Sequence, residues 1–401
     1  MKDMSTRQTS PSLPFIDLAA QRRRIGKRVD RAIARVMQHG KFILGPEVET
    51  LERNLEDFSG ARHCITCANG TDALILSLLA HSIGPGDAVL VPTFTFLATA
   101  EAVVRVGATP ILMDVDRDSF HLDLASLSLA LSAARRHKLR PRAVIVVDLF
   151  GQPASYAAVR RQAAEHGLVV VADAAQSFGA SRNGSMVGTL ADITTTSFYP
   201  SKPLGCYGDG GAIFTDDDDK ADRIRALRGH GQSTRSGDTS LIGMNSRLDT
   251  LQAAVLLEKL RIFPAELEAR NAVARVYAAA LQGVVRCPKI SAKATSVWAQ
   301  YTVIVEEDRD ALVRACAAAG IPTAVHYAKP VHLLEAYCDF PRATADLPVA
   351  EWLSRHVVCL PMHPYLGQAD RLRVTKAVVA AVGRPLRRKI HVLDPQPALP
   401  D

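Results

Sequence analysis

The amino-acid sequence predicts an α/β protein with a mostly parallel central sheet that carries helices on both faces, and a smaller C-terminal α+β domain. The first observation is a series of short, valine-rich apolar runs at residues 87–92, 109–115, 142–150 and 167–175, each bounded by Gly, Pro or Asp. Helix-patterned stretches separate these runs. Continuous apolar strands that alternate with helices are typical of a parallel sheet covered on both faces.

The second observation is the length of the chain. Its 401 residues are too many for one ordinary domain and correspond to roughly two or three domains. We assign residues 14–261 to a large domain and residues 262–382 to a small C-terminal domain. The polar segment 1–13 and the proline- and charge-rich segment 383–401 are expected to be flexible tails.

The large domain is expected to begin and end with helices. One helix is predicted over residues 22–38. A turn at Gly45-Pro46 leads into a second helix, whose apolar residues share one face: Val48, Leu51, Leu55 and Phe58. Proline suits the first turn of a helix because its missing N–H would be unpaired there anyway. A long helix over residues 247–260 closes the domain.

The pattern changes after Pro264 and indicates the α+β domain. Its expected elements, in order, are a helix over 265–281, a strand within 297–305, a helix over 310–320 and a β run over 321–327.

Composition and charge exclude several classes of protein. Hydrophobic residues make up 48% of the chain and charged residues 22%, the balance of a folded globular protein. No apolar run reaches the ~20 residues that a membrane helix needs. The N-terminus lacks the apolar core of a signal peptide, so we expect a cytoplasmic protein without a membrane partner. The net charge of +7 suits an anionic substrate, and no nucleic-acid-binding motif accompanies it.

The seven cysteines are expected to be reduced thiols. Cys64 and Cys67 form a CxxC pair, but no second pair or histidine follows at the spacing of a zinc site. We therefore expect no metal site.

The segment from Thr194 to Thr215 places a lysine in an irregular loop. Lys202 lies between Ser201 and Pro203, and Pro203 cannot continue a helix or donate to a strand ladder. Such a loop can bring a deprotonated lysine amine close to a carbonyl group. The amine then forms a Schiff base with that carbonyl. A single loop lysine is more often a solvated surface residue, so this interpretation depends on other residues.

Asp173 strengthens the interpretation of Lys202, because it follows the buried run 169–172. A buried carboxylate is costly without a partner, and the protonated ring nitrogen of pyridoxal phosphate is one such partner. Gln176 follows three residues later and could bind the phenolic oxygen of that ring. The alternative for Asp173 is a helix cap or a satisfied core carboxylate.

Two further stretches could complete a cofactor site. Gly70 and Thr71 belong to a turn that leads into an apolar helix, and backbone N–H groups at such a helix start bind phosphate. Ser197 is a second candidate hydroxyl for that phosphate. Phe96 could stack on a flat aromatic ring, or could equally be core. The glycines at 205–211 do not match GxGxxG, which argues against a nicotinamide oxidoreductase.

At this point the sequence resembles a known family, the DegT/DnrJ/StrS sugar aminotransferases, which have the fold-type I architecture of pyridoxal-phosphate enzymes. The resemblance spans residues 14–370. The stretches that carry it are GPEVETLE, NGTDAL, FTFLATAEAV, LFGQP, ADAAQSFGA, SFYPSKPLGCYGDGGAIFT, HGQ, NSRLDTLQAAVL, GIPTAVHY and LPMHPYL.

The resemblance implies that pyridoxal 5'-phosphate is the cofactor and assigns roles to the residues above. Lys202 would hold the cofactor covalently and move the proton, while Asp173 would pair with the ring nitrogen. The remaining cofactor contacts would come from Gln176, Phe96, Gly70, Thr71 and Ser197. The resemblance also implies a homodimer with shared active sites, in which Asn245 of the partner subunit completes the phosphate site.

Finer similarities point to the members of the family that aminate UDP-2-acetamido-2-deoxy-3-oxo-glucuronate with L-glutamate, for bacterial lipopolysaccharide. They imply that Arg247, supplied by the partner subunit, reads substrate anions, and that His326 and Tyr327 line the sugar pocket. A satisfied histidine at a strand end is the alternative for His326.

Two departures and two alternatives accompany the resemblance. Many relatives have His where Asp148 stands, and the family pattern HYPxP reads HYAKP at 326–330. One alternative is an aminotransferase for a dTDP-keto sugar or a keto-cyclitol. The other is a cofactor-binding regulatory or scaffold protein without turnover. A lysine at position 202 argues for transamination, because relatives that remove a hydroxyl group carry His there.

Overall fold

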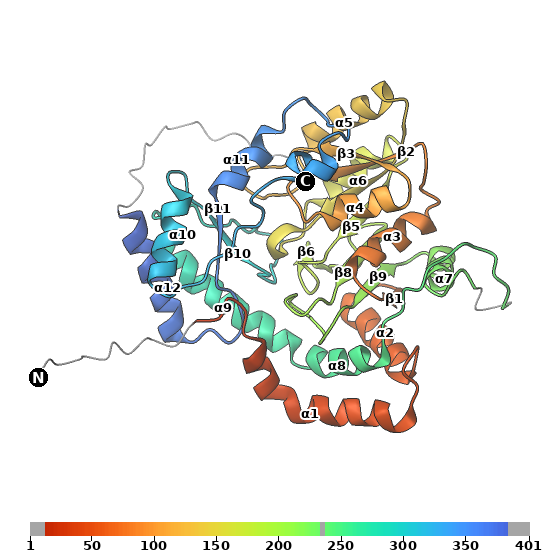
Figure 1. The fold of residues 1–401 in the computed structure, drawn as a ribbon, viewed down its shortest axis with the longest axis horizontal. Helices are drawn as coiled ribbons and strands as arrows, with labels where there is room; N and C mark the ends of the chain where they lie inside the picture. Colours follow the sequence, from red (N-terminus) through yellow and green to blue (C-terminus); the bar gives the residue numbers. More distant parts are fainter. Residues whose placement is uncertain (1–12, 233–236, 384–401) are drawn as a thin grey trace, which may run out of the picture.

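The computed structural model describes residues 13–232 and 237–383 (Figure 1). The tails expected at 1–13 and 383–401 therefore lie outside the described residues, apart from Leu13 and Gly383. Leu13 is buried among side chains of the C-terminal region.

The larger part of the molecule is built on a sheet with the strand order β1-β9-β8-β5-β4-β2-β3. Only β9 runs antiparallel to its neighbours, so the prediction of a mostly parallel sheet is confirmed. The strands are β1 (His63–Cys67), β2 (Asp87–Pro92), β3 (Thr109–Met113), β4 (Arg140–Val147), β5 (Val169–Asp173), β8 (Ile193–Ser197) and β9 (Gly211–Thr215).

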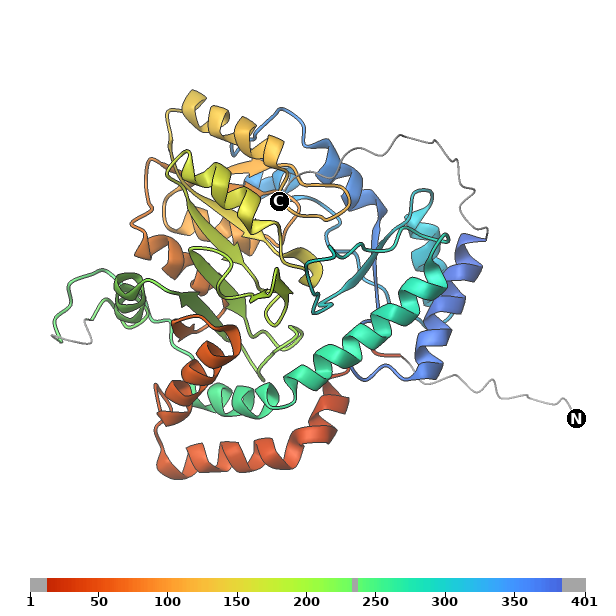
Figure 2. The same cartoon turned by 180° about the vertical axis from the view of Figure 1, so that it is seen from behind.

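All four valine-rich runs contain a strand of this sheet, and helices lie on both sides of it (Figures 1 and 2). The run 142–150 stops being a strand at Val147, because a short 3-10 turn, η1 (Leu149–Gly151), follows. The helices of this part are α1 (Leu18–His39), α2 (Pro46–Ser59), α3 (Gly70–Ala80), α4 (Ala98–Arg105), α5 (Leu124–Arg136), α6 (Tyr156–Ala164), α7 (Asp218–Leu227) and α8 (Thr250–Leu260). A small hairpin joins β6 (Ser181–Arg182) to β7 (Ser185–Met186).

Two predicted helices have different starts in the structure. The first helix begins already at Leu18, where the Asp17 carboxylate accepts a hydrogen bond of 2.8 Å from the N–H of Ala20. The helix predicted from residue 247 begins at Thr250, because Asp249 before it has an extended backbone. The helix at Pro46 starts as predicted.

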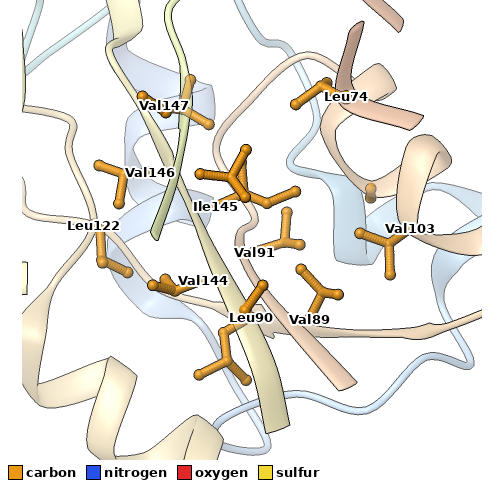
Figure 3. Packing of buried hydrophobic residues seen from close by; sticks show 14 of the residues in the cluster. Leu74, Val89, Leu90, Val91, Val103, Leu122, Val144, Ile145, Val146 and Val147 are labelled. Carbon is orange, nitrogen blue, oxygen red and sulfur yellow. The ribbon is translucent and has the colours of Figure 1, made fainter. Parts of the chain in front are cut away.

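The core of the large sheet consists of the valine-rich strands themselves. Figure 3 shows side chains of β2 and β4, including Val91 and Ile145, packed beside Leu74 of α3 and Val103 of α4. These four side chains are at most 2% exposed. Because these side chains are buried, apolar packing holds the central strands in place. The loops that follow these strands carry the site.

The C-terminal part has its own two-stranded antiparallel sheet and a separate hydrophobic cluster. Its elements are α9 (Phe263–Leu281), β10 (Tyr301–Ile304), α10 (Arg309–Ala318), η2 (Val331–Leu333), η3 (Glu335–Tyr337), α11 (Pro348–His356), β11 (Val357–Leu360) and α12 (Gln368–Val382). Figure 2 shows α9 running from the large part of the molecule to α12. Val331, Leu347 and Leu353 instead join the core of the large sheet.

The β run predicted over 321–327 is wrong as a strand. Ala324 makes one isolated bridge with Cys359, and no further pairing extends it. Pro322 has no N–H to donate, which limits the pairing of this segment with β11.

Two further features concern membrane spans and cysteines. Within 13–232 and 237–383, no helix combines the length and apolar character required to span a bilayer. All seven cysteines are free thiols.

Candidate active site

A cavity of about 960 Å³ lies at the carboxyl ends of the parallel strands, where ligands bind in sheets of this kind. Its wall combines the start of α3, the loops after β5 and β8, and the segment around residues 326–327. Nine of the predicted site residues line it: Gly70, Thr71, Phe96, Asp173, Gln176, Ser197, Lys202, His326 and Tyr327.

Asp173 is the last residue of β5 and is 8% exposed. Its carboxylate accepts hydrogen bonds from the Thr99 hydroxyl at 2.8 Å and from the N–H of Ala175 at 3.3 Å. Burial raises the pKa of Asp173, while these two donors and the nearby Lys202 oppose the rise. Lys202 is the cation that opposes the rise, and its effect on the pKa of Asp173 is the smallest of the three.

Lys202 lies in the loop between β8 and β9, as its neighbours Ser201 and Pro203 predict. The N–H of Lys202 donates to the carbonyl of Tyr199 at 2.8 Å, and the amine of buried Lys259 donates to the carbonyl of Gly205 at 2.6 Å, so the loop is held from both ends. Burial lowers the pKa of the Lys202 amine, and Asp173 opposes this shift. Among the described residues, no hydrogen bond or ion pair engages the Lys202 Nζ. A lysine of lowered pKa is suited to act as a nucleophile.

Another part of the cavity wall is the N-terminus of α3. Asn69 caps this helix by accepting a 2.8 Å hydrogen bond from the N–H of Asp72. A side chain at Gly70 would place its Cβ 2.7 Å from the Cβ of Ser197, so only glycine lets the helix start approach the serine. The N–H groups at the start of α3, with the hydroxyls of Thr71 and Ser197 beside them, form a cradle for an anion.

A third group of residues links the wall to the C-terminal part. The Gln176 side chain accepts from the N–H of Phe150 at 2.7 Å and donates to the Tyr327 hydroxyl at 3.2 Å. The ring centroids of Tyr327 and Phe96 are 6.3 Å apart, and Phe96 is 52% exposed. Burial, and to a smaller extent Lys202, lowers the pKa of His326.

Asn245 and Arg247 do not line this cavity. They lie in the segment before α8, where the Arg247 guanidinium donates to the Asn245 side-chain oxygen at 2.8 Å. Asn245 is exposed, and its neighbour Met244 does reach the cavity wall. Their assignment to the active site of a partner subunit stays a prediction.

Sequence reasoning missed Thr99, which donates to the Asp173 carboxylate from α4. Thr99 lies near Phe96 in the sequence, but nothing in its spacing indicates that its hydroxyl turns toward a carboxylate on β5. Asp148 is also close: its N–H donates to the Asp173 carbonyl at 3.1 Å. Burial raises the pKa of Asp148 to about 7.

These groups match the parts of pyridoxal phosphate. The anion cradle at α3 suits its phosphate, Asp173 suits a protonated ring nitrogen, and the free Lys202 amine suits its aldehyde. The raised pKa of Asp173 and the lowered pKa of Lys202 show that burial disfavours the charged form of both groups. Such a ligand would offset this cost of burial for both of them. The described residues contain no cluster of three or more side chains that could hold a metal ion.

Known proteins are similar to this chain over almost its whole length. A curated relative, UDP-2-acetamido-2-deoxy-3-oxo-D-glucuronate aminotransferase of Pseudomonas aeruginosa, is 47% identical over 359 residues, covering 89% of this chain and 97% of the relative. The dTDP-3-amino-3,4,6-trideoxy-alpha-D-glucose transaminase of Streptomyces venezuelae is 39% identical, with 94% and 97% covered. The crystal structure of a DegT DnrJ EryC1 StrS aminotransferase from Brucella abortus superposes with a TM-score of 0.91 at 48% identity, covering 93% of this chain and all of that one (100%).

The family comparison agrees with the geometry. Residues 23–379 match the DegT/DnrJ/EryC1/StrS aminotransferase family. The fold-type I architecture and the pyridoxal-phosphate cofactor expected from the sequence are both confirmed by this family match. The protein belongs to the DegT/DnrJ/EryC1/StrS family of pyridoxal-phosphate-dependent sugar aminotransferases.

Proposed function

We propose that the protein transfers the amino group of L-glutamate to the C3 ketone of UDP-2-acetamido-2-deoxy-3-oxo-glucuronate, for bacterial lipopolysaccharide synthesis in the cytoplasm. The observation that carries the substrate is the 47% identity to the Pseudomonas aeruginosa enzyme, with 97% of that enzyme covered. The cavity of about 960 Å³ is at the upper end of the usual range for small-molecule sites, as a nucleotide sugar requires.

The cofactor contacts follow from the geometry of the wall. The start of α3 at Gly70 and Thr71, with Ser197, would hold the phosphate. Asp173 would keep the ring nitrogen protonated, and Phe96 would lie against the ring. Gln176 would turn its amide from Tyr327 toward the phenolic oxygen.

Lys202 is the group that moves the proton. When bound, pyridoxal phosphate withdraws electrons from the carbon that carries the amino group, which makes the proton on that carbon acidic. The Lys202 Nζ, whose pKa is lowered by burial, would take this proton from the α-carbon of glutamate. In the second half of the reaction it would return a proton to C3 of the sugar.

The remaining contacts would come from the C-terminal part and from a second subunit. His326 and Tyr327 would face the sugar. We further propose a homodimer in which the Arg247 guanidinium of one subunit binds an anionic group of the substrate held by the other, with Asn245 at the phosphate. A planar guanidinium forms two parallel hydrogen bonds with a carboxylate or a phosphate oxygen pair.

A second candidate substrate is a dTDP-linked keto sugar, because the Streptomyces venezuelae transaminase is 39% identical over 378 residues. The Arg247→Ala variant separates the two candidates. In a homodimer with shared sites, the loss of Arg247 should weaken the binding of the UDP-linked uronate, which carries a carboxylate beside its diphosphate, more than the binding of a dTDP-sugar whose sugar ring is uncharged.

The visible absorption spectrum of the purified protein tests the proposal. The lysine-linked cofactor should give a band that L-glutamate bleaches, and the UDP-linked keto sugar should restore it. The Lys202→Ala variant should retain the fold by circular dichroism but lose both the band and turnover. A protein that stays colourless after incubation with pyridoxal phosphate, or a Lys202→Ala variant with wild-type turnover, would refute the proposal.

A further inference from the structure

Gln300 has a fixed place beside the active-site cavity. Segment 297–300 packs closely across Phe150 and Gly151: Val297 donates its N–H to the Gly151 carbonyl at 3.0 Å, and Gln300 donates its own to the Phe150 carbonyl at 3.4 Å. A Cβ at Gly151 would lie only 2.9 Å from the Ala299 nitrogen. The backbone that carries Gln300 is therefore held against the loop after β4.

The same loop connects Gln300 to the predicted cofactor contacts. The N–H of Phe150 donates to Gln176, whose amide donates to Tyr327. Through Phe150, Gln300 is linked to Gln176 and Tyr327, and all three of these side chains line the main cavity. Gln300 also lines a smaller hollow next to this cavity.

The side-chain amide of Gln300 differs from those of its two glutamine neighbours. Gln176 uses both ends of its amide, on Phe150 and Tyr327. Gln152, which lines the smaller hollow, also uses both ends: it donates to the Lys289 carbonyl at 3.3 Å and accepts from the N–H of Ser291 at 2.7 Å. The Gln300 Oε1 is buried with no hydrogen-bond partner, and its amide nitrogen has none among the described residues.

Buried polar atoms are almost always hydrogen-bonded in native proteins, so an unengaged amide in a cavity wall calls for an explanation. A bound ligand supplies one. We infer that Gln300 is a sugar-binding residue, whose amide exchanges hydrogen bonds with a hydroxyl or acetamido group of the keto sugar. This inference rests on the proposed function and adds a specificity contact to the same site.

The chemistry of the amide favours the sugar over the amino donor. The unpaired Oε1 needs a hydrogen-bond donor; the carboxylates of L-glutamate have none to offer, and its amino group is the one that joins the cofactor. Sugar hydroxyls and an acetamido group carry both a donor and an acceptor, as the amide of Gln300 does. Carboxylates are matched better by cationic side chains.

The test uses the full-length protein loaded with pyridoxal phosphate and measures bleaching of the visible band by two different amines. One amine is L-glutamate, and the other is the UDP-linked 2-acetamido-3-amino uronic acid, which runs the sugar half-reaction backward. In Gln300→Leu, the half-saturating concentration of the amino sugar should rise roughly 10-fold or more, the effect of losing one or two hydrogen bonds. The value for L-glutamate should stay within about twofold of the wild type by the same reasoning.

Two further variants keep the test decisive. Gln300→Glu preserves the shape and an acceptor but loses the N–H donors and adds a negative charge. This variant should weaken the binding of the acidic amino sugar at least as much as Gln300→Leu does, and it should keep the visible band. Gln282→Leu, at an exposed position at the end of α9, is the matched control and should change neither amine.

The outcomes separate this inference from the proposed function. The role of Gln300 would be overturned if a Gln300→Leu protein that keeps its band bound both amines equally more weakly than the wild type. It would also be overturned if that protein bound both amines as tightly as the wild type. A wild-type protein that glutamate bleaches but the UDP-linked amino sugar does not would overturn the proposed substrate and this inference with it.

Discussion

Asp148 and Asp173 stand at the ends of two neighbouring parallel strands, and both carboxylates are buried, but their surroundings differ. Asp148 is fully enclosed and accepts from the N–H of Ala154 at 2.8 Å, the Tyr156 hydroxyl at 2.8 Å and the Ser177 hydroxyl at 2.7 Å. Among the described residues, Asp173 has only Thr99 and Ala175 as donors, and it lies in the cavity wall.

The difference shows that a buried carboxylate at the carboxyl end of a parallel strand can be either a structural group or a ligand-binding group. The donors of Asp148 come from the protein on all sides, so no ligand is needed to satisfy it. The electrostatic partners of Asp173 include Lys202, and its remaining capacity is open to a ligand. Burial raises the pKa of both groups, so a shifted pKa alone would not have distinguished the ligand-binding carboxylate from the structural one.

The largest expected effect is the loss of catalysis in the Asp173→Asn variant. Asparagine retains the shape and can still accept from Thr99, but it cannot stabilise a positive charge on the ring nitrogen. We expect kcat to fall up to roughly 1000-fold, the scale of losing a preorganised electrostatic partner. Stopped-flow bleaching by L-glutamate measures this.

Asp148→Asn is the matched control, because it removes a negative charge one strand away. Its Oδ1 can still accept, and the Ser177 hydroxyl can turn to accept from its Nδ2. It should keep kcat within about tenfold of the wild type, the effect of one net hydrogen bond at most. Equal losses in both variants would contradict the distinction between the two carboxylates.

The next effect is on stability and concerns Asp148→Ala. This change leaves the Tyr156 and Ser177 hydroxyls and the N–H of Ala154 buried without their acceptor. Each unsatisfied buried group costs about 1–3 kcal/mol, so the free energy of unfolding should fall by about 3 kcal/mol or more. Denaturant titration of Asp148→Ala against Asp148→Asn measures it, and similar midpoints for the two variants would show that the hydrogen bonds contribute little.

A further effect on stability is the pH dependence that Asp148 confers. Its pKa in the folded protein is about 7, above the ordinary value of 3.8, so the folded state holds this proton more tightly than the unfolded state. Stability from this group is therefore present at low pH and is lost as the pH rises from about 4 to about 7, by at most roughly 1.4 kcal/mol per pH unit.

Asp148→Asn removes this dependence, because asparagine does not titrate. The stability of the variant relative to the wild type should therefore grow between pH 4 and pH 7 and be constant above that range. A constant difference across the whole range would mean that Asp148 has an ordinary pKa in the folded protein.

The sequence predicted one of these carboxylates better than the other. Asp173 was recognised because a buried apolar strand leads into it and a loop lysine follows. Asp148 follows an equally apolar strand, yet its donors Tyr156 and Ser177 are held by tertiary packing and leave no pattern in the sequence. The strands themselves were predictable because β2, β4 and β5 are buried on both faces and read as continuous apolar runs.

Other features were less accessible for the same reason. The segment 321–327 has the composition of a strand, but only Ala324 in it forms a bridge, with Cys359 of β11. The extent of this pairing depends on where β11 lies, and the sequence does not show that. Gln300 lies in an apolar strand pattern, and its unpaired amide is visible only when the loop after β4 is placed against it.

The smallest expected effect is that of Thr99→Val, which sharpens the comparison at a single hydrogen bond. The Thr99 hydroxyl donates to Asp173 at 2.8 Å and pairs with the Thr95 hydroxyl at 2.9 Å. Its hydrogen bond opposes the rise in the pKa of Asp173, so its loss should raise that pKa and move the acid limb of the kcat profile to higher pH. Above the limb, kcat should fall less than roughly tenfold, the effect of one net hydrogen bond of about 1 kcal/mol. Thr95→Val removes the neighbouring hydroxyl but keeps the donor to Asp173, so it should leave the limb in place; a limb that shifts equally in both variants would show that packing of α4, and not the hydrogen bond from Thr99, sets the charge state of Asp173.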